Sequence, residues 1–294
     1  MVGPPLPDRV RARALIDPAD RATLRTLLSR HGLRATRSAG QHFLASPAVR
    51  EAVVAAAELS STDRVVEIGP GLGALTARLA AAAGHVRAFE IDPRLVTILR
   101  DDVLGGASNV EIVEADALAV DLLSSRPTRV VANLPYQITT PILERVLGDA
   151  RRPPLCVFMV QAEVAERMRG TPRSWLSIFV ASFAQVALVR RVSPGAFEPP
   201  PRVASAIVRL VARERPLFAP YPQDAFLSLV SDTFRHRRKT LVSALGFEAR
   251  LDRSRAMEAV TGAGIKSGAR AETLAAADWV RLYEELARRG LRPR

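Results

Sequence analysis

The sequence contains one cysteine, Cys156, and only four histidines among 294 residues. A single cysteine cannot form a disulfide within the chain, and four scattered histidines do not form the cluster of a structural metal site. We therefore expect neither a disulfide-stabilised secreted fold nor a bound metal. Cys156 lies in the apolar run Leu155 to Val160, which predicts a buried strand, and an unpaired buried thiol fits a reducing compartment.

Long apolar segments are also missing. No apolar run approaches the ~18 residues that a membrane-spanning helix needs, and residues 1–7 have neither the basic start nor the apolar centre of a signal peptide. We expect a soluble, cytoplasmic protein with no membrane partner. Long repeats and low-complexity tracts are absent as well, so a solenoid or a disordered scaffold is not predicted.

Positive charge is present in excess, since 42 Lys and Arg residues face 30 Asp and Glu residues and give a net charge of +12. Such a chain is drawn towards polyanions, and RNA phosphates are the natural partner in the cytoplasm. With 294 residues and 48% hydrophobic content, the chain can form one large domain and a smaller one.

A glycine-rich stretch marks the first candidate site. The apolar run at residues 64–68 leads into Gly69-Pro70-Gly71-Leu72-Gly73, and the helix formers of residues 74–83 follow. This order predicts the first strand, turn and helix of a doubly wound parallel sheet, with glycines that let the backbone approach a ligand. No Gly-Lys-Ser/Thr follows, which excludes a phosphate-binding loop of the nucleoside-triphosphatase type. A plain connection between a strand and a helix remains the alternative.

Acidic residues stand at the ends of three successive strand-like runs, where ligands of such sheets bind. Glu67 ends the first run, Glu90-Ile91-Asp92 ends the second, and Asp116-Ala117 follows the third. Glu90 lies about 20 residues beyond the glycines, where an acid can bind ribose hydroxyls, and Asp116 can accept a hydrogen bond from an adenine amino group. Each acid taken alone could be an ordinary solvated side chain.

The segment Asn133-Leu134-Pro135-Tyr136 follows a fourth strand-like run, Val130 to Ala132. The Asn133 side-chain oxygen and the Leu134 carbonyl can accept hydrogens from a base amine, Pro135 stiffens the turn, and Tyr136 can stack on the base. Alone, the segment could be an ordinary turn after a strand. No group here titrates near neutral pH, so methyl transfer is favoured over the hydride transfer of an NAD-dependent dehydrogenase.

Taken together, six stretches resemble the ribosomal RNA adenine dimethyltransferases, which use S-adenosyl-L-methionine to methylate an adenine amine twice. These stretches are Gly40 to Leu44, Glu67 to Gly73, Glu90 to Asp92, Asp116-Ala117, Asn133 to Tyr136 and Phe197 to Val203. With further strand-like runs at residues 155–160, 187–192 and 206–211, the sequence predicts seven strands. We expect an α/β class I methyltransferase fold, Rossmann-like, with a smaller all-helical C-terminal domain.

The resemblance implies roles for individual residues. Phe197 would face Tyr136 across the target adenine, although it could instead be a hydrophobic plug, and His42 would touch the cofactor, although it could be a hydrogen-bonded spacer. The catalytic residues implied are Asn133, Leu134, Pro135, Tyr136 and Phe197. The residues implied for binding S-adenosyl-L-methionine are Gln41, His42, Leu44, Glu67, Gly69, Gly71, Glu90, Ile91, Asp116, Ala117 and Asn133.

The resemblance covers two branches with different targets. The motifs resemble those of the housekeeping enzymes that dimethylate small-subunit RNA during ribosome biogenesis, and a large-subunit enzyme that confers macrolide resistance is the alternative. Three departures from the housekeeping pattern bear on the choice of target: Ser38-Ala39, Arg173-Ser174-Trp175, and an N-terminal extension through about Leu33 that is longer than typical. The partner implied is ribosomal RNA within a ribosomal subunit or its precursor. An RNA-binding assembly factor with secondary catalysis is a further alternative.

The chain divides into three predicted parts. Residues 1–33 form an N-terminal extension, residues 34–214 the S-adenosylmethionine-binding methyltransferase domain, and residues 215–294 a helical RNA-binding domain. The extension contains an amphipathic pattern from about residue 19 to 30, which predicts a helix with a solvated or RNA-facing side. We expect the protein to be a monomer.

A run of basic residues occurs in the helical part. Helical periodicity over residues 223–245 places the run within the first helix of this part, and a second periodic segment covers residues 275–288. Like charges on successive helical positions repel each other unless a polyanion neutralises them, so we expect RNA binding, with a solvated face as the alternative. The residues expected to bind RNA are Arg235, Arg237, Arg238 and Lys239.

Overall fold

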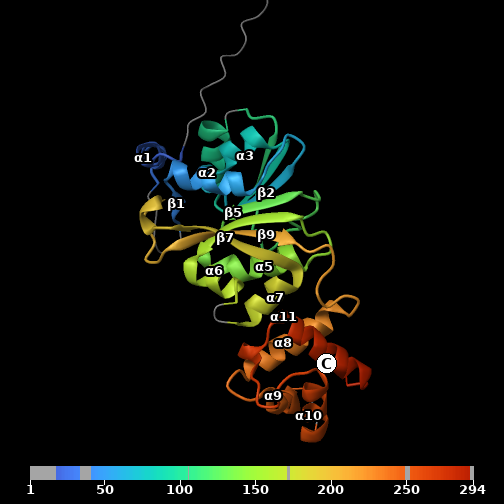
Figure 1. Ribbon diagram of the computed structural model, residues 1–294. Coiled ribbons are helices and arrows are strands. Elements are labelled where there is room, and N and C mark those ends of the chain that lie inside the picture. The colour runs from blue at the N-terminus through green and yellow to red at the C-terminus, as the bar shows by residue number, and fades with distance from the viewer. Residues whose placement is uncertain (1–17, 34–40, 105, 171–172, 249–251, 292–294) are drawn as a thin grey trace, which may run out of the picture.

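A seven-stranded sheet forms the centre of the molecule. The computed structural model describes residues 18–33, 41–104, 106–170, 173–248 and 252–291. Within these residues the strands lie in the order β4-β3-β2-β5-β6-β9-β7 (Figure 1). The first five in this order run parallel, whereas β9 is antiparallel to both of its neighbours. The strands are β2 (Arg64–Ile68), β3 (His85–Glu90), β4 (Val110–Glu114), β5 (Arg129–Asn133), β6 (Leu155–Gln161), β7 (Ala184–Val192) and β9 (Ser205–Ala212).

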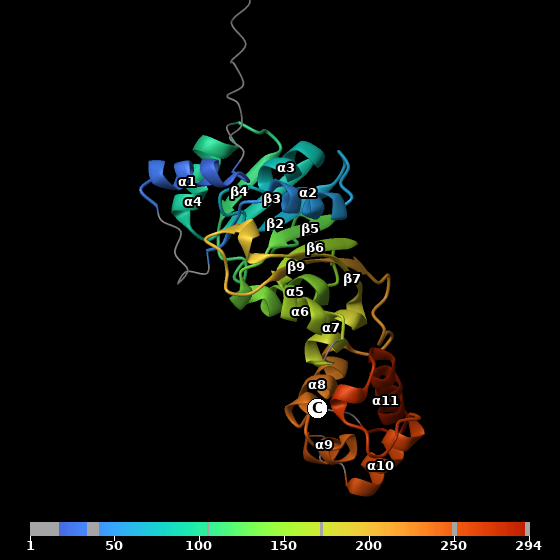
Figure 2. The same ribbon diagram turned by 60° about the vertical axis from the view of Figure 1, so that its left-hand side comes forward.

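The predicted class I methyltransferase sheet is confirmed, and helices cover both of its faces (Figure 2). Successive strand residues point to opposite faces, so Val65 packs in one apolar cluster and Val66 in another. The helices on the Val65 side are α2 (Pro47–Ala56) and α3 (Thr76–Ala82). Those on the Val66 side are α5 (Thr139–Gly148), α6 (Ala162–Met168) and α7 (Trp175–Phe183).

The chain order of the strands creates an edge of the kind at which open α/β sheets bind ligands. The chain runs outward from β2 through β3 to β4, then returns to the other side of β2 to form β5 and β6. The carboxyl ends of β2 and β5 therefore lie side by side where the direction of winding reverses, which is where open α/β sheets bind ligands.

The predicted N-terminal helix is confirmed as α1 (Arg21–Arg30). Asp20 caps it by accepting a hydrogen bond from the Thr23 amide at 2.8 Å. Its apolar face packs against α4 (Pro93–Ile98) and the π-helical turn Leu99–Val103 that extends α4. The buried residues of α1 are Leu24, Leu27 and Leu28. Residues 1–17 and 34–40, with Gly40 and Ser38-Ala39, lie outside the described residues, and the domain boundary at Leu33 stays a prediction.

A second, two-stranded sheet was not expected from the sequence. Here β1 (Phe43–Leu44) pairs antiparallel with β8 (Phe197–Glu198), so that Phe43 lies opposite Glu198 and Leu44 opposite Phe197. Two stretches that are far apart in the sequence are thereby joined beside the main sheet. Both belong to motifs that carry the family resemblance.

Among its described residues, the C-terminal part of the molecule contains four α-helices and lies at the bottom of Figures 1 and 2. They are α8 (Gln223–Arg235), α9 (Leu241–Glu248), α10 (Arg253–Gly262) and α11 (Ala276–Arg288). The mainly helical character of this part was predicted correctly. The described residues contain no helix with the length and apolar content that crossing a membrane requires.

The prediction of one helix over residues 223–245 is wrong, as is the placement of the basic run within it. Helix α8 ends at Arg235, and the chain then turns before α9 begins at Leu241. Turn amides bond the last carbonyls of α8, with His236 N donating to Thr233 O at 3.1 Å. Positive charge at a helix C-terminus favours this end over a continued helix, because it complements the helix dipole.

Aromatic rings join the C-terminal helices to the sheet domain. Phe183 at the end of α7 contacts Phe218 edge-on with ring centroids 5.5 Å apart, and Phe218 stacks on Phe226 of α8 at 4.8 Å. Phe226 in turn meets Tyr283 of α11 at 5.9 Å. The same apolar cluster includes residues of the sheet and of all four C-terminal helices, so the two parts share one core.

Candidate active site

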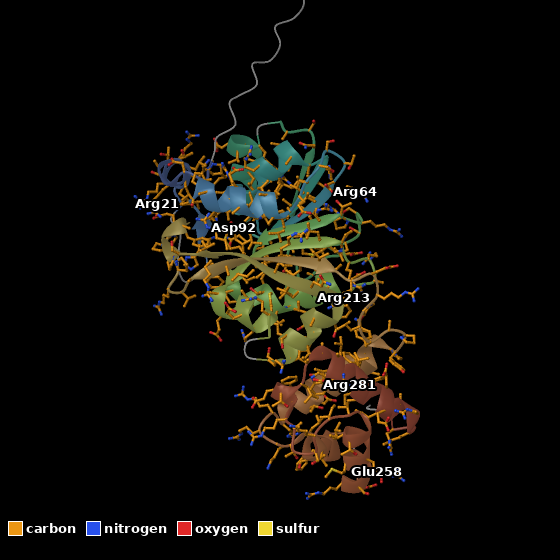
Figure 3. All side chains as sticks on the ribbon, viewed as in Figure 1. Arg21, Arg64, Asp92, Arg213, Glu258 and Arg281 are labelled. Atoms are coloured by element: carbon orange, nitrogen blue, oxygen red, sulfur yellow. The ribbon has the colours of Figure 1, made fainter. Side chains whose placement is uncertain are left out.

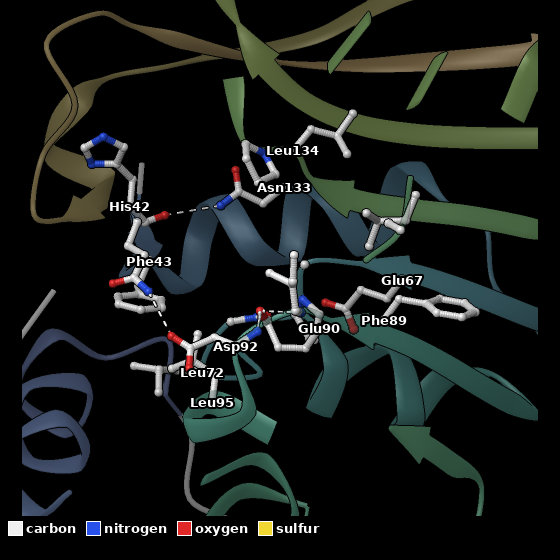
Figure 4. A pocket seen from close by; sticks show the side chains of 18 of the residues that line it. His42, Phe43, Glu67, Leu72, Phe89, Glu90, Asp92, Leu95, Asn133 and Leu134 are labelled. Carbon is white, nitrogen blue, oxygen red and sulfur yellow. Dashed lines mark hydrogen bonds between the residues drawn. The ribbon is translucent and has the colours of Figure 1, made fainter. Parts of the chain in front are cut away.

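A cavity of about 480 Å³ opens at the carboxyl ends of β2, β3 and β5 (Figure 4). Every residue that the sequence predicted for catalysis or cofactor binding lines it. They are Gln41, His42, Leu44, Glu67, Gly69, Gly71, Glu90, Ile91, Asp116, Ala117, Asn133, Leu134, Pro135, Tyr136 and Phe197. What each of them binds stays a prediction.

The glycine-rich loop adopts conformations that suit glycine. Gly71 has φ +60°, and a Cβ at this position would lie 3.1 Å from Phe43 Cδ1. Gly73 has φ +83°, and a Cβ there would lie 2.8 Å from Leu99 Cδ2. A larger residue would thus meet both backbone strain and a side chain. The loop needs these glycines to pass close to β1 and to the end of α4.

Glu90 is fixed in the cavity wall by backbone amides. Its Oε2 accepts from Gly71 N at 3.0 Å, and its Oε1 accepts from Ile91 N at 2.9 Å and Asp92 N at 3.0 Å. The residue is only 6% exposed, and burial raises the pKa of its carboxyl above the ordinary value. A carboxylate has about four acceptor positions, so a ligand hydroxyl can still be bound.

Glu67 carries an unsatisfied polar atom into the cavity wall. It is 1% exposed, and its Oε2 has no hydrogen-bond partner among the described residues. Burial, together with a smaller effect of the nearby Glu90, raises the pKa of this carboxyl to about 8 against an opposing contact with the Thr76 hydroxyl. Since buried polar groups are nearly always hydrogen-bonded in folded proteins, this oxygen fits a bound ligand that offers a donor.

Ile91 and Asp116 form a second part of the cavity with different chemistry. Ile91 is 67% exposed although it is large and apolar, and such a surface suits the face of a flat ring. Asp116 is exposed after β4, and its Oδ1 accepts from Leu118 N at 2.8 Å. An apolar surface with a carboxylate nearby fits an adenine ring and its amino group.

Hydrogen bonds to His42, to strand β6 and to helix α5 hold residues 133–136 in place. The Asn133 Nδ2 donates to the His42 carbonyl at 3.3 Å, which orients the amide so that Oδ1 remains available as an acceptor (Figure 4). Leu134 N donates to Met159 O at 3.0 Å. The Pro135 carbonyl accepts from the Thr139 hydroxyl at 3.2 Å. These bonds fix the turn before any substrate arrives.

Two aromatic rings stand close together at the cavity. The rings of His42 and Tyr136 stack with centroids 6.1 Å apart and an angle of 29° between their planes. His42 Nδ1 also lies 2.8 Å from the Pro199 carbonyl, which agrees with its alternative role as a hydrogen-bonded spacer. The Tyr136 hydroxyl lies 3.0 Å from Ser205 Oγ. The sequence did not predict the contact between these two rings.

Phe197 lines the cavity but is only 1% exposed, and it packs in the apolar cluster that contains Leu44 and Val49. The ring contacts of the described residues do not include a pair between Phe197 and Tyr136. Both predicted alternatives for Phe197, a contact with the base and a hydrophobic plug, therefore remain open.

Three further residues that line the cavity were not predicted from the sequence. Leu24 of α1 lines the cavity together with Phe43 of β1 and Leu95 of α4. The spacing of Leu24, Leu27 and Leu28 shows that α1 has an apolar face, but it does not show which surface that face covers. The described residues contain no group of three or more His, Cys, Asp or Glu side chains placed to hold a metal ion.

The basic residues predicted to bind RNA do not line this cavity; Arg235 is the last residue of α8, and Arg237, Arg238 and Lys239 lie in the turn before α9. Arg237, Arg238 and Lys239 are exposed, while Arg235 forms an ion pair with Asp232 at 3.1 Å. The structure thus separates two predicted sites, a cavity at the sheet edge and a charged turn in the helical part.

The chain is similar to ribosomal RNA methyltransferases over most of its length. The family model for "Ribosomal RNA adenine dimethylase" matches residues 32–288. "Ribosomal RNA small subunit methyltransferase A" of Moorella thermoacetica is 42% identical over 264 residues, which cover 84% of this chain and 91% of that protein. The protein of the same name from a Synechococcus strain is 43% identical over 259 residues, with the same two coverages.

Two solved structures are similar over most of their length. A dimethyladenosine transferase from Plasmodium falciparum superposes with a TM-score of 0.76 at 26% identity, covering 86% of this chain and all of that one. The 23S rRNA methyltransferase ErmE superposes with a TM-score of 0.67 at 31% identity, covering 83% of this chain and 99% of that one.

Proposed function

The chain belongs to the ribosomal RNA adenine dimethylase family, and we propose that residues 133–136 carry out its methyl transfer. It is an S-adenosylmethionine-dependent methyltransferase that dimethylates the N6 amine of adenine in small-subunit ribosomal RNA, an activity linked to ribosome biogenesis. The observation that supports the roles of individual residues is the cavity, because one space is lined by the strand-end acids, the glycine loop and the oriented Asn133 amide.

The small-subunit target is supported by the degree of likeness. The curated relatives named for the small subunit are 42% and 43% identical to this chain, whereas the large-subunit enzyme ErmE is 31% identical. A large-subunit enzyme of the resistance type is therefore the runner-up. An assembly factor with secondary catalysis is less well supported, because a protein with an idle pocket has no need for pre-oriented acceptors.

The residues of the cavity fit the methyl donor. When bound, S-adenosylmethionine supplies a methyl group on a positively charged sulfur. Glu90 would accept hydrogen bonds from ribose hydroxyls, Asp116 from the adenine amine, and Ile91 would cover the adenine face. Glu67 would use its unpartnered Oε2 for a donor of the ligand. The glycine loop would allow the backbone to approach closely.

The segment of residues 133–136 would bind and orient the target amine. The Asn133 Oδ1 and the Leu134 carbonyl would accept its two hydrogens, which aims the nitrogen lone pair away from these acceptors. As the nitrogen takes the methyl group, the carbon–sulfur bond of the donor breaks and S-adenosylhomocysteine leaves as a neutral thioether. The nitrogen would gain positive charge in this step, and both carbonyl dipoles would stabilise that charge more than the neutral amine. Tyr136 would stack on the base and add a cation–π contribution. The alkylated nitrogen is acidic enough to release its proton to water.

The RNA must bring the adenine out of its stack to reach the cavity. We propose that Arg237, Arg238 and Lys239 bind RNA phosphates while the cavity holds the base. We further propose that the protein works as a monomer in the cytoplasm, where ribosomal subunits are assembled. Sedimentation of the purified protein at micromolar concentration would test the monomer.

Replacing Asn133 by alanine tests the proposed chemistry. We expect the single-turnover rate on undermethylated small subunits to fall about 100-fold or more, as when one preorganised polar group is removed from a site that stabilises developing charge. Calorimetry with S-adenosylhomocysteine should show a much smaller change in cofactor affinity.

The matched control is Asn109→Ala. Asn109 also donates to backbone carbonyls, those of Ala80 and Ala83, but it does not line the cavity. Its variant should methylate at the parental rate. Single-turnover methylation by Asn133→Ala at the parental rate would contradict the assignment. Preferential methylation of large subunits would support the runner-up.

A further inference from the structure

Helix α1 binds the loop that carries Phe197. Arg21 Nη2 donates to the Gly195 carbonyl at 2.7 Å and to the Phe197 carbonyl at 3.3 Å, and Arg21 Nε lies 3.3 Å from Glu198 Oε2. Arg25 Nη2 donates to both carboxylate oxygens of Glu198 at 3.1 Å. Figure 3 shows Arg21 at the upper left of the molecule, where Figure 1 labels α1. Arg21 thus holds the backbone at Phe197 and two residues before it, and both arginines hold the side chain of Glu198, the residue that follows Phe197.

The opposite end of α1 is attached to the π-helical turn that extends α4. Arg30 Nη1 donates to Asp102 Oδ1 at 2.9 Å, and His31 Nε2 lies 2.6 Å from Asp102 Oδ2. The hydrogen bond from His31, followed by the contacts with Arg30, holds the pKa of the Asp102 carboxyl below its ordinary value. Between the two ends, Leu24 is fully buried and lines the cavity. One helix therefore connects the Phe197 loop, the cavity wall and the end of α4.

The contacts of Arg21 differ from those of an ordinary surface ion pair. An exposed pair of opposite charges contributes little to stability and restricts little motion. Arg21 instead bonds two backbone carbonyls, one at Phe197 itself and one two residues before it. The Arg21 side chain is 43% exposed and the Glu198 side chain 18%, so only the carboxylate of the pair is largely shielded from water. These bonds restrict the loop more than a contact between side chains alone would.

We propose that Arg21, supported by Arg25 and Glu198, is a positioning residue for methyl transfer, holding the Phe197 loop at the cavity from helix α1. This inference rests on the proposed function, since it requires that the Phe197 loop shapes the site of the target adenine. It gives α1 a role in the reaction, although the helix precedes residue 32, where the family match begins. The role is specific to the N-terminal half of the helix.

Variants of the full-length protein test this proposal. Arg21→Ala should lower kcat for methylation of undermethylated small subunits about tenfold or more, because displacement of about 1 Å at an active site can cost up to about 100-fold. Affinity for S-adenosylhomocysteine, measured by calorimetry, should stay within about twofold. Glu198→Gln leaves the two backbone bonds of Arg21 in place, so it should lower kcat by less.

Arg30→Ala is the matched control. It removes an arginine–carboxylate pair from the same helix, at the end that does not touch the Phe197 loop, and His31 still contacts Asp102. We expect a parental kcat from this variant. Equal losses of kcat in Arg21→Ala and Arg30→Ala would mean that α1 acts only as a scaffold, and the proposal would be wrong.

Two further results would separate the possible explanations. A parental kcat for a folded Arg21→Ala variant, beside a slow Asn133→Ala variant, would overturn this inference and leave the proposed function intact. A parental rate for Asn133→Ala would overturn the proposed function itself. If Arg21→Ala does not fold, Arg21→Gln replaces it, because the shorter, uncharged glutamine side chain cannot make all three contacts of Arg21. A parental kcat for a folded Arg21→Gln variant would also overturn the inference.

Discussion

Replacing Glu67 by glutamine probes the buried carboxyl of the cavity. Burial raises the pKa of Glu67 from an ordinary 4.5 to about 8. The folded protein therefore holds a proton that the unfolded chain releases between these two pH values. Stability from the neutral carboxyl is fully present below pH 4.5 and is lost as pH rises towards 8, because the unfolded state binds fewer protons in this window.

The size of the effect follows from the same values. Each pH unit between the unfolded and the folded pKa of Glu67 lowers the unfolding free energy by about 1.4 kcal/mol. The upper limit of this loss is roughly 3 kcal/mol at pH 7 and roughly 5 kcal/mol at pH 8. Glutamine has nearly the same shape and cannot ionise. Water entry and relaxation reduce the limit, so we expect Glu67→Gln to exceed the parent in unfolding free energy by about 2 to 3 kcal/mol at pH 8, and hardly at all at pH 5.

Urea denaturation of the ligand-free protein at pH 5, 6, 7 and 8 measures this difference. The parent and the variant share all other titrating groups, so the common pH dependence cancels. Glu214→Gln is the matched control, because Glu214 is exposed and lies outside the cavity. A difference between Glu67→Gln and the parent that does not grow with pH would refute the reasoning.

Two other features allow direct tests. Gly73→Ala should lower the unfolding free energy by about 2 kcal/mol, because alanine is strained at φ +83° and its Cβ would lie 2.8 Å from a leucine methyl. Denaturant unfolding measures this loss. The control is Gly268→Ala, whose Cβ would point into open space, and its unfolding free energy should stay within about 0.5 kcal/mol of the parent. Replacing Arg237 and Arg238 by alanine should weaken RNA binding and lower the slope of log affinity against log salt by about 1 to 2. Filter binding over a salt series checks this, with the exposed Arg126→Ala as control, and an unchanged slope would argue against RNA contact at this turn.

The sequence was informative where short-range patterns decide the structure. The seven strands follow from apolar runs of a length typical of strands, and the topology of a doubly wound sheet then brings Glu67, Glu90, Asp116 and Asn133 to one edge. These residues could be predicted together because each one ends or follows a strand. The spacing of Leu24 and its neighbours likewise predicted α1.

Long-range contacts were beyond such patterns. The strands β1 and β8 have two residues each, which is too short for any period to be detected, and they become strands only because they pair with each other. The contact between His42 and Tyr136 and the burial of Phe197 both depend on this pairing. The cavity wall formed by Leu24 depends on how α1 packs against α4.

The break between α8 and α9 was missed for a different reason. Apolar residues continue with helical spacing across the turn, since Phe226 and Leu229 before it and Leu241 and Leu245 after it are all buried. Periodicity alone cannot detect a change of direction when both segments face one core. Two local features mark the end of α8 and the start of α9. Charged residues are concentrated after Phe234, and the Thr240 hydroxyl accepts a hydrogen bond from Ser243 N at 3.4 Å at the start of α9.

The rings that link Phe183, Phe218, Phe226 and Tyr283 leave little freedom for the helical part to swing relative to the sheet. These contacts favour one fixed length for the separation between the basic turn and the cavity. An RNA whose phosphates rest on that turn can deliver an adenine to Asn133 only if its own folded shape spans the same length. Under the RNA contact proposed for this turn, the folded shape of the RNA, and not only its sequence, selects which part of it reaches the cavity.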